Sequence, residues 1–484
     1  MKRETDPLTG LDRHVRATPA SRSFKVVLVN PYELGRQPFA LAEPTAWLRR
    51  AGFEVACVDL SRDRLDPDVL EEAGLIAIFL GMHTATRIAT ELLPRLRERR
   101  PEAHLCAYGL YAPLNEALLR ELGVISLFGG ESEPDLVALA ELLREGGRPG
   151  PVNRIRTRGV PFLPPERDGL PDLDRYAKLR LPDGEERVCG FVEASRGCKH
   201  LCRHCPVVPV YGGRFRAVPV DVVLGDVRQQ VAAGARHVSF GDPDFLNGPG
   251  HALRVVEALH DAFPQLTYDC TIKVEHLVGR PDLLPTLAAT GCLWITTAVE
   301  SLDDAVLERL DKGHTRDDFV HALALARAAG VPLAPTFVPF TPWNGLEAYV
   351  DLLRGLLDLG LVHSVPPVQL SIRLLVPSGS LLLELDDFRA QLGPFDRATL
   401  GYPWHHPDPR VDALQREVAE IASTGEADGL ARGAIFARVW SAAHAALDVP
   451  APSLEGADFG PTIPALDEPW YCCAEPTEQQ LASF

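Results

Sequence analysis

The chain has 484 residues, 46% hydrophobic and 24% charged, an ordinary composition for a globular protein of two or three domains. Its formal charge of −17 argues against general nucleic-acid binding, because an acidic surface repels polyphosphate. No apolar run is long enough to span a membrane and the N-terminus is polar, so we expect a cytoplasmic protein without a membrane partner. Ten cysteines without a secretory signal favour metal or redox use over a disulfide framework.

Residues 1–23 are polar without periodicity, which predicts a disordered arm. Over residues 24–146, short apolar runs alternate with amphipathic segments, which predicts an α/β domain with a doubly wound (flavodoxin-like) parallel sheet. The predicted strands are 25–29, 53–58, 74–80, 103–108 and 123–128. Ligands bind such sheets outside the carboxyl ends of the strands. We therefore expect any ligand of this domain at that edge.

Residues 147–187 are rich in Pro, Gly and Arg and are predicted to be a linker. A second alternation fills residues 188–379, with predicted strands at 188–194, 235–240, 267–273, 292–299, 331–338 and 368–375. Six βα-type units predict a partial (βα)6 barrel, whose chemistry gathers at the carboxyl ends of the strands. A mainly helical region is expected over 380–460, followed by a Pro-rich tail over 461–484.

Three cysteines lie close together after the first strand of this second alternation. Cys198, Cys202 and Cys205 have the spacing CxxxCxxC, and no fourth cysteine follows at motif distance. A structural zinc site closes with four ligands, whereas three thiolates on a four-iron cluster leave one iron open. His200 or His204 could complete a zinc site, so the spacing alone leaves both metals open.

This motif resembles that of the radical SAM superfamily, in which the open iron takes the amino and carboxylate groups of S-adenosylmethionine (SAM). The resemblance implies a 4Fe-4S cluster on Cys198, Cys202 and Cys205, with SAM as a second cofactor. Gly241 and Asp242 follow the second strand, where the family carries an acidic turn that binds the SAM ammonium. An ammonium group needs carbonyl or carboxylate acceptors, which a Gly-Asp turn supplies.

The resemblance extends to five other positions. Glu300 and Ser301 end the fourth strand, as in cobalamin-type relatives whose glutamate contacts SAM. His204 stands where the family usually has an aromatic residue near the adenine. Lys273 and Arg373 stand where it often places a basic residue at the mouth of the active site. The resemblance also implies an electron donor such as flavodoxin or ferredoxin.

The N-terminal sheet resembles the cobalamin-binding domain that precedes many radical SAM barrels, through Gly129–Glu133 and the linker sequence LPDLDRY. Cobalamin is therefore expected as a third cofactor. The Asp-x-His-x-x-Gly motif that supplies an axial histidine to cobalt is absent, as it commonly is in this class. The alternative is a domain that only covers the barrel.

The tail carries two adjacent cysteines, Cys472 and Cys473, in the sequence CCAEP. Vicinal thiols suit thiophilic partners or a reducible disulfide. The sequence resembles the CUAEP/CCAEP-tail radical SAM (seleno)proteins, some of which have selenocysteine where this chain has Cys473. We therefore predict that the pair is catalytic, as substrate ligands or as a redox or hydrogen-atom donor pair.

The predicted function is a radical SAM transferase that moves a methyl or other carbon group to a small-molecule substrate, with SAM and cobalamin as carriers. One alternative is a cobalamin-independent enzyme that transfers the aminocarboxypropyl group of SAM to a thiol-bound metalloid. Another is a non-catalytic metal or redox sensor.

Overall fold

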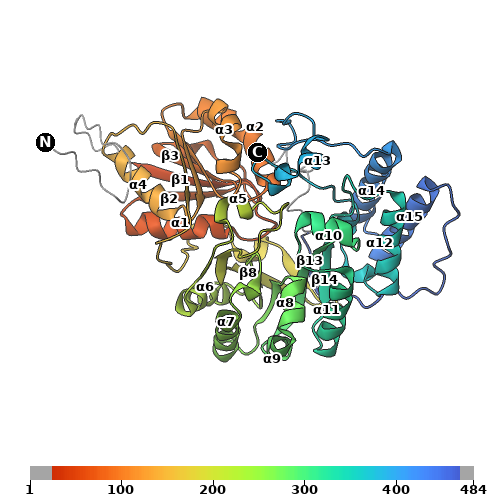
Figure 1. Cartoon of the computed structure of the whole chain (residues 1–484). Helices are drawn as coiled ribbons and strands as arrows, with labels where there is room; N and C mark the ends of the chain where they lie inside the picture. The colour runs from red at the N-terminus through yellow and green to blue at the C-terminus, as the bar shows by residue number, and fades with distance from the viewer. Residues whose placement is uncertain (1–23, 469–484) are drawn as a thin grey trace.

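The computed structural model describes residues 24–468, which form an N-terminal α/β domain, a half-barrel and a helical C-terminal region (Figure 1). The predicted arm 1–23 and the cysteine pair of the tail therefore lie outside the described residues. The N-terminal sheet has six parallel strands in the order β2-β1-β3-β4-β5-β6, the flavodoxin-like order with one strand added. The strands are β1 Lys25–Asn30, β2 Glu54–Asp59, β3 Ala73–Phe79, β4 His104–Tyr108, β5 Ser126–Gly130 and β6 Val152–Arg156.

Helices cover both faces of this sheet, as the alternation of apolar residues requires. Val26 and Leu28 of β1 point to one face, in a core shared with α1 and α4. Val27 and Val29 point to the other, in a core shared with α2 and α3. The helices are α1 Phe39–Arg50, α2 His83–Arg99, α3 Glu116–Glu121 and α4 Glu133–Arg144. The predicted doubly wound fold is confirmed.

The segment 147–187, expected to be a linker, contains two strands. β6 pairs parallel to β5 at the edge of the N-terminal sheet, and its side chains alternate between half-buried and exposed. β7 (Lys178–Arg180) pairs antiparallel to the first strand of the half-barrel. Both strands are short, polar and at or near a sheet edge, so neither carries the apolar run that marks a central strand.

The half-barrel is built on five parallel strands, with the order β14-β13-β12-β11-β8. They are β8 Glu186–Val192, β11 His237–Phe240, β12 Thr267–Thr271, β13 Cys292–Glu300 and β14 Leu333–Phe337. Beyond β8 the sheet continues with β7, which is antiparallel to β8, and then with β15 (Ala465–Leu466), which is antiparallel to β7. The helices of this region are α6 Val220–Ala232, α7 Pro249–Ala262, α8 Val274–Gly279, α9 Leu284–Ala289, α10 Asp304–Leu310, α11 Arg316–Ala328 and α12 Leu346–Asp358.

The sixth predicted strand, 368–375, is reduced to a single bridge between Phe340 and Arg373. A 3-10 turn occupies Pro367–Leu370 instead. Pro366 and Pro367 precede and begin this turn, and a proline has no N–H to donate to a ladder. Five of the six predicted strands of the partial barrel are therefore formed.

Three short elements bracket the cysteine loop, 198–205. The two-stranded ribbon of β9 (Ser195–Gly197) and β10 (Phe215–Ala217) is antiparallel, and α5 (Val208–Tyr211) follows the last cysteine. The C-terminal region contains α13 Asp386–Arg389, α14 Pro409–Ala427 and α15 Arg432–Ala446, joined by irregular segments. α14 and α15 pack on each other, and α15 also contacts α12 (Figure 1). No helix within 24–468 is both long and apolar enough to cross a bilayer.

Candidate active site at the cysteine loop

The three cysteines share one loop at the carboxyl end of β8. Cys198 and Cys202 are buried, Cys205 is half-buried, and all three are free thiols. Burial, and then the neighbouring Cys202 and Cys198, raise the pKa of Cys205 to about 12. A thiol with so high a pKa stays protonated at neutral pH unless it binds a metal ion, which deprotonates a coordinating thiol outright. The donor set therefore fits a metal cofactor.

The geometry favours a cluster over a single zinc ion. Tetrahedral zinc with Zn–S bonds near 2.3 Å would bring its ligand atoms to about 3.8 Å from one another. Within 24–468, one group of potential ligands has all its donor atoms within 4.8 Å, and it contains no cysteine. His200 lies 3.3 Å from Asp244, and His204 lies 3.2 Å from Glu300. Both histidines of the loop thus face carboxylates, as an iron–sulfur site with three thiolates allows.

Glu300, at the end of β13, is the most constrained carboxylate near the loop. It adopts φ of +71°, a conformation that costs a non-glycine residue energy. Its Oε1 accepts from His204 Nε2 at 3.2 Å and from Lys312 Nζ at 3.3 Å. Burial raises its pKa, but Lys312 and His204 outweigh that effect and lower it to about 2. Glu300 is therefore an ionised carboxylate held by a buried ion pair.

Lys312 was not singled out from the sequence. It is 3% exposed, and Glu300 together with the thiols of Cys202 and Cys205 raises its pKa against the effect of burial. A buried ammonium group beside two cluster cysteines is suited to offset the negative charge of a thiolate-ligated cluster. Nothing in its spacing to the cysteines marks it in the sequence.

Asp242 anchors the start of the cysteine loop. Its two carboxylate oxygens accept hydrogen bonds from the Ala194 backbone N–H at 2.9 Å and the Ser195 hydroxyl at 2.5 Å. Burial raises its pKa to about 7, despite those hydrogen bonds. Gly241 before it has no room for a side chain, because a Cβ would lie 2.1 Å from the Phe191 ring. The predicted SAM-binding role of Asp242 stays a prediction, and the structure adds a positioning role.

The other predicted residues lie in different surroundings. Ser301 is buried and its hydroxyl accepts from the Asp303 backbone N–H at 3.0 Å. Lys273, at the N-terminal end of α8, is 7% exposed, with its Nζ 3.2 Å from Glu275. These two residues and Glu300 occupy the carboxyl ends of neighbouring strands β12 and β13, as predicted for the mouth of the barrel.

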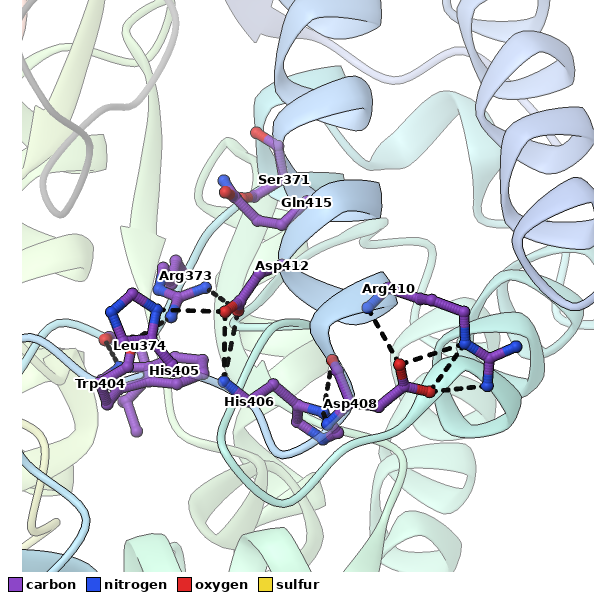
Figure 2. Close-up of polar contacts among 10 residues, drawn as sticks. All are labelled: Ser371, Arg373, Leu374, Trp404, His405, His406, Asp408, Arg410, Asp412 and Gln415. Atoms are coloured by element: carbon purple, nitrogen blue, oxygen red, sulfur yellow. Dashed lines mark hydrogen bonds and ion pairs between the residues drawn. The ribbon is translucent and has the colours of Figure 1, made fainter.

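Arg373 belongs to a separate polar group with the C-terminal helices. Figure 2 shows its guanidinium between Trp404 and Asp412: it lies 3.5 Å from the indole centroid and donates to Asp412 at 2.7 Å. The His406 backbone N–H also points to Asp412, and His405 is largely exposed. Arg373 is therefore engaged by the 404–412 segment, a pairing that the sequence analysis did not foresee.

Arg196, two residues before Cys198, joins the cysteine loop to the N-terminal domain. It is buried and forms ion pairs with four glutamates: Glu43, Glu131, Glu133 and Glu193. Arg216 of β10 also pairs with Glu131 at 2.8 Å. Burial raises the pKa of Glu131 and of Glu133 to about 7. Arg196 thus pairs with carboxylates from both domains.

The carboxyl edge of the N-terminal sheet meets the loop at a second place. Leu110, which follows β4, packs against an apolar cluster formed by Cys198, Val207, Val210 and Tyr211. On the same edge an apolar group follows β1 and β3, formed by Tyr32, Leu34, Met82, Ala85 and Ile88. The ligand-binding edge of one domain therefore adjoins the cysteine loop of the other.

Residues 192–353 match the radical SAM superfamily. The chain therefore contains a radical SAM domain over these residues, and such a domain implies a 4Fe-4S cluster and SAM. A tRNA-2-methylthio-N(6)-dimethylallyladenosine synthase of Pelodictyon phaeoclathratiforme is 28% identical over 176 residues, which are 32% of this chain and 37% of that protein. The chain spans 37% to 57% of the length of the first curated relatives it matches.

Two solved structures resemble the whole fold more closely. The radical SAM methyltransferase TsrM of Kitasatospora setae, with tryptophan and a SAM analogue bound, has a TM-score of 0.63 at 18% identity, over 83% of this chain and 90% of that one. The cobalamin-dependent SAM radical enzyme OxsB, with aqua-cobalamin bound, has a TM-score of 0.64 at 15% identity, over 83% and 67%. The shared fold includes the N-terminal domain as well as the barrel.

Proposed function

We propose that this chain is a cobalamin-dependent radical SAM enzyme that transfers a methyl or other carbon group to a small-molecule substrate. The observation that carries the proposal is the cysteine loop, with three buried or half-buried thiols, packed against the ligand-binding edge of a flavodoxin-like domain. Bound there, a 4Fe-4S cluster would supply the electron that cleaves SAM, taken from a donor such as flavodoxin or ferredoxin.

The chain's own residues would then hold the reactants. Three of the four irons of the cluster would be bound by Cys198, Cys202 and Cys205. The Lys312 ammonium would offset the negative charge of the thiolate-ligated cluster. Glu300, kept ionised by Lys312 and His204, presents a carboxylate at the end of β13 for the hydroxyl or ammonium groups of SAM. Asp242 fixes the loop through Ala194 and Ser195.

Cobalamin fits the edge of the N-terminal sheet. Tyr32, Met82 and Ile88 form an apolar cluster there, and Leu110 of the same edge packs against the cluster that contains Cys198. Small-molecule and cofactor sites are mostly apolar with few polar groups, and doubly wound sheets bind ligands at this edge. The structural likeness to OxsB supports this assignment.

The tail cysteines start from an anchored point at the same edge. Glu468 accepts a hydrogen bond from the Tyr32 hydroxyl at 3.0 Å and lies 3.9 Å from Arg62. Cys472 and Cys473 follow it by four and five residues, so the chain can carry them at most about 14 and about 18 Å from Glu468. We propose that the pair acts on the substrate within that radius.

Product analysis tests the proposal. Anaerobically reconstituted protein with cobalamin, reductant and SAM should form 5′-deoxyadenosine and S-adenosylhomocysteine, and Cys198→Ala should form neither. Methylthioadenosine would instead indicate transfer of the aminocarboxypropyl group. A protein that binds iron but consumes no SAM would identify a sensor and contradict the proposal.

A further inference from the structure

Beside the cysteine loop, three side chains from separate elements point their donor atoms at one another. They are His200 of the loop, Asp244 after β11 and His276 in α8. These donor atoms lie within 4.8 Å of one another, and no other set of three or more within 24–468 does so. The proposed function uses none of the three.

The separations are those of ion pairs, but the angles are not those of hydrogen bonds. Asp244 Oδ2 is 3.3 Å from His200 Nε2 and 2.7 Å from His276 Nδ1. All three atoms are buried, and none has a partner in hydrogen-bond geometry. A buried polar atom without a partner costs about 1–3 kcal/mol, and here three of them share one small volume. A bound cation would satisfy the three together.

The surroundings orient the three ligands. His200 Nδ1, the other ring nitrogen, lies 3.5 Å from Glu275, and metal-bound histidines commonly donate that second N–H to a carboxylate. The second oxygen of Asp244 accepts from the Lys273 backbone N–H at 3.4 Å. The two imidazole rings stand 61° apart, with centroids separated by 4.9 Å, so their nitrogens converge from different directions.

We propose that His200, Asp244 and His276 bind one divalent first-row transition ion, separate from the iron–sulfur cluster. Two imidazoles and one carboxylate form the donor set of non-haem Fe2+ sites, and the same set accepts Zn2+ or Mn2+. Three protein ligands leave coordination positions open for an anionic group of a substrate. The site would therefore position a carboxylate- or hydroxyl-bearing substrate at the mouth of the barrel.

Titration of the cluster-loaded protein with Mn2+ tests the proposal, because the oxidised 4Fe-4S cluster is diamagnetic and the Mn2+ signal is read directly by EPR. We expect one Mn2+ per chain, with nitrogen couplings from two histidines in electron spin-echo spectra of the unmodified protein. Asp244→Asn and His276→Gln should weaken Mn2+ binding at least 100-fold. Glu275→Gln, which removes only the outer carboxylate, should weaken it about tenfold.

His260→Gln is the matched control. His260 is also half-buried, with an unpartnered ring nitrogen, but it lies on α7 outside the ligand group. The His260→Gln variant should bind Mn2+ as tightly as the unmodified chain. Absent nitrogen coupling in the unmodified protein would overturn the proposal, even if a variant failed to fold. So would variants that keep Mn2+ affinity but lose SAM binding, because the three residues would then serve SAM.

Discussion

At the scale of single residues, Asp242 makes the stability of the folded protein depend on pH. Its carboxylate is buried and holds Ala194 and Ser195, and burial raises its pKa to about 7 in the folded protein. An aspartate with a raised folded pKa binds its proton more tightly when folded than when unfolded. Its contribution to stability is therefore fully present below the unfolded pKa near 3.8 and is lost as the pH rises through 7.

We predict a pH-dependent difference between the natural chain and Asp242→Asn. Between pH 5 and pH 8, the natural chain should lose roughly 2–3 kcal/mol of unfolding free energy relative to the variant, since asparagine does not titrate. Urea unfolding at both pH values measures this. A difference that is constant with pH would show that Asp242 stays ionised throughout.

Single residues were predicted unevenly from the sequence. The three cysteines and Glu300 could be selected from the sequence because a short spacing or a strand end carries them, and their roles stay predictions. Lys312 and Asp244 were missed, because their roles depend on contacts made only after β11 and β13 bring distant segments together. Arg373 has the expected position along the chain, but Asp412 and Trp404 come from another region and engage it.

At the scale of elements, the ribbon of β9 and β10 sets the course of the cysteine loop. Gly197 ends β9 with φ of +73°, directly before Cys198. A Cβ there would lie 2.4 Å from both the Arg214 carbonyl oxygen and the Tyr211 ring. Such contacts are too short for any real side chain, so the loop would have to move.

Gly197→Ala should therefore lose cluster iron, while Gly212→Ala should keep it. Gly212 also has a positive φ, of +55°, but nothing lies within 4 Å of its Cβ position. The two variants share the backbone cost of about 1–2 kcal/mol and differ only in the collision. Iron content after anaerobic reconstitution distinguishes them, and equal iron in both would refute a tight turn at Gly197.

The elements themselves followed the sequence where apolar periodicity was strong. The first five strands of the N-terminal sheet and five strands of the half-barrel lie where short apolar runs predicted them. β6 was missed because an edge strand buries little, and the predicted sixth barrel strand failed because Pro366 and Pro367 favour a turn. Apolar periodicity alone predicts neither a polar edge strand nor a turn at a pair of prolines.

At the scale of the whole molecule, Arg196 connects the N-terminal domain with the segment that leads into the cysteine loop. Its partners Glu43, Glu131 and Glu133 belong to the N-terminal domain, and Glu193 precedes the loop. No sequence pattern joins these residues, since the fold alone assembles them. Movement of either domain would expose buried charge, so the ion pairs hold the two in a fixed relation.

Arg196→Lys should destabilise the protein by about 3–5 kcal/mol, because a single ammonium cannot replace a guanidinium that pairs with three buried carboxylates and one half-buried carboxylate. Arg214→Lys is the control, since Arg214 directly precedes β10 and is exposed. Thermal unfolding of both variants measures the difference. Equal melting temperatures would contradict the inferred role of Arg196.

The metal content and visible spectrum of anaerobically purified protein test most directly whether the cysteine loop holds an iron–sulfur cluster. We predict four irons per chain, a cluster absorption that dithionite bleaches, and loss of both in Cys198→Ala, Cys202→Ala and Cys205→Ala. The unmodified chain should also cleave SAM when reduced. Stoichiometric zinc without iron in the unmodified chain would contradict the cluster, and with it the proposed chemistry.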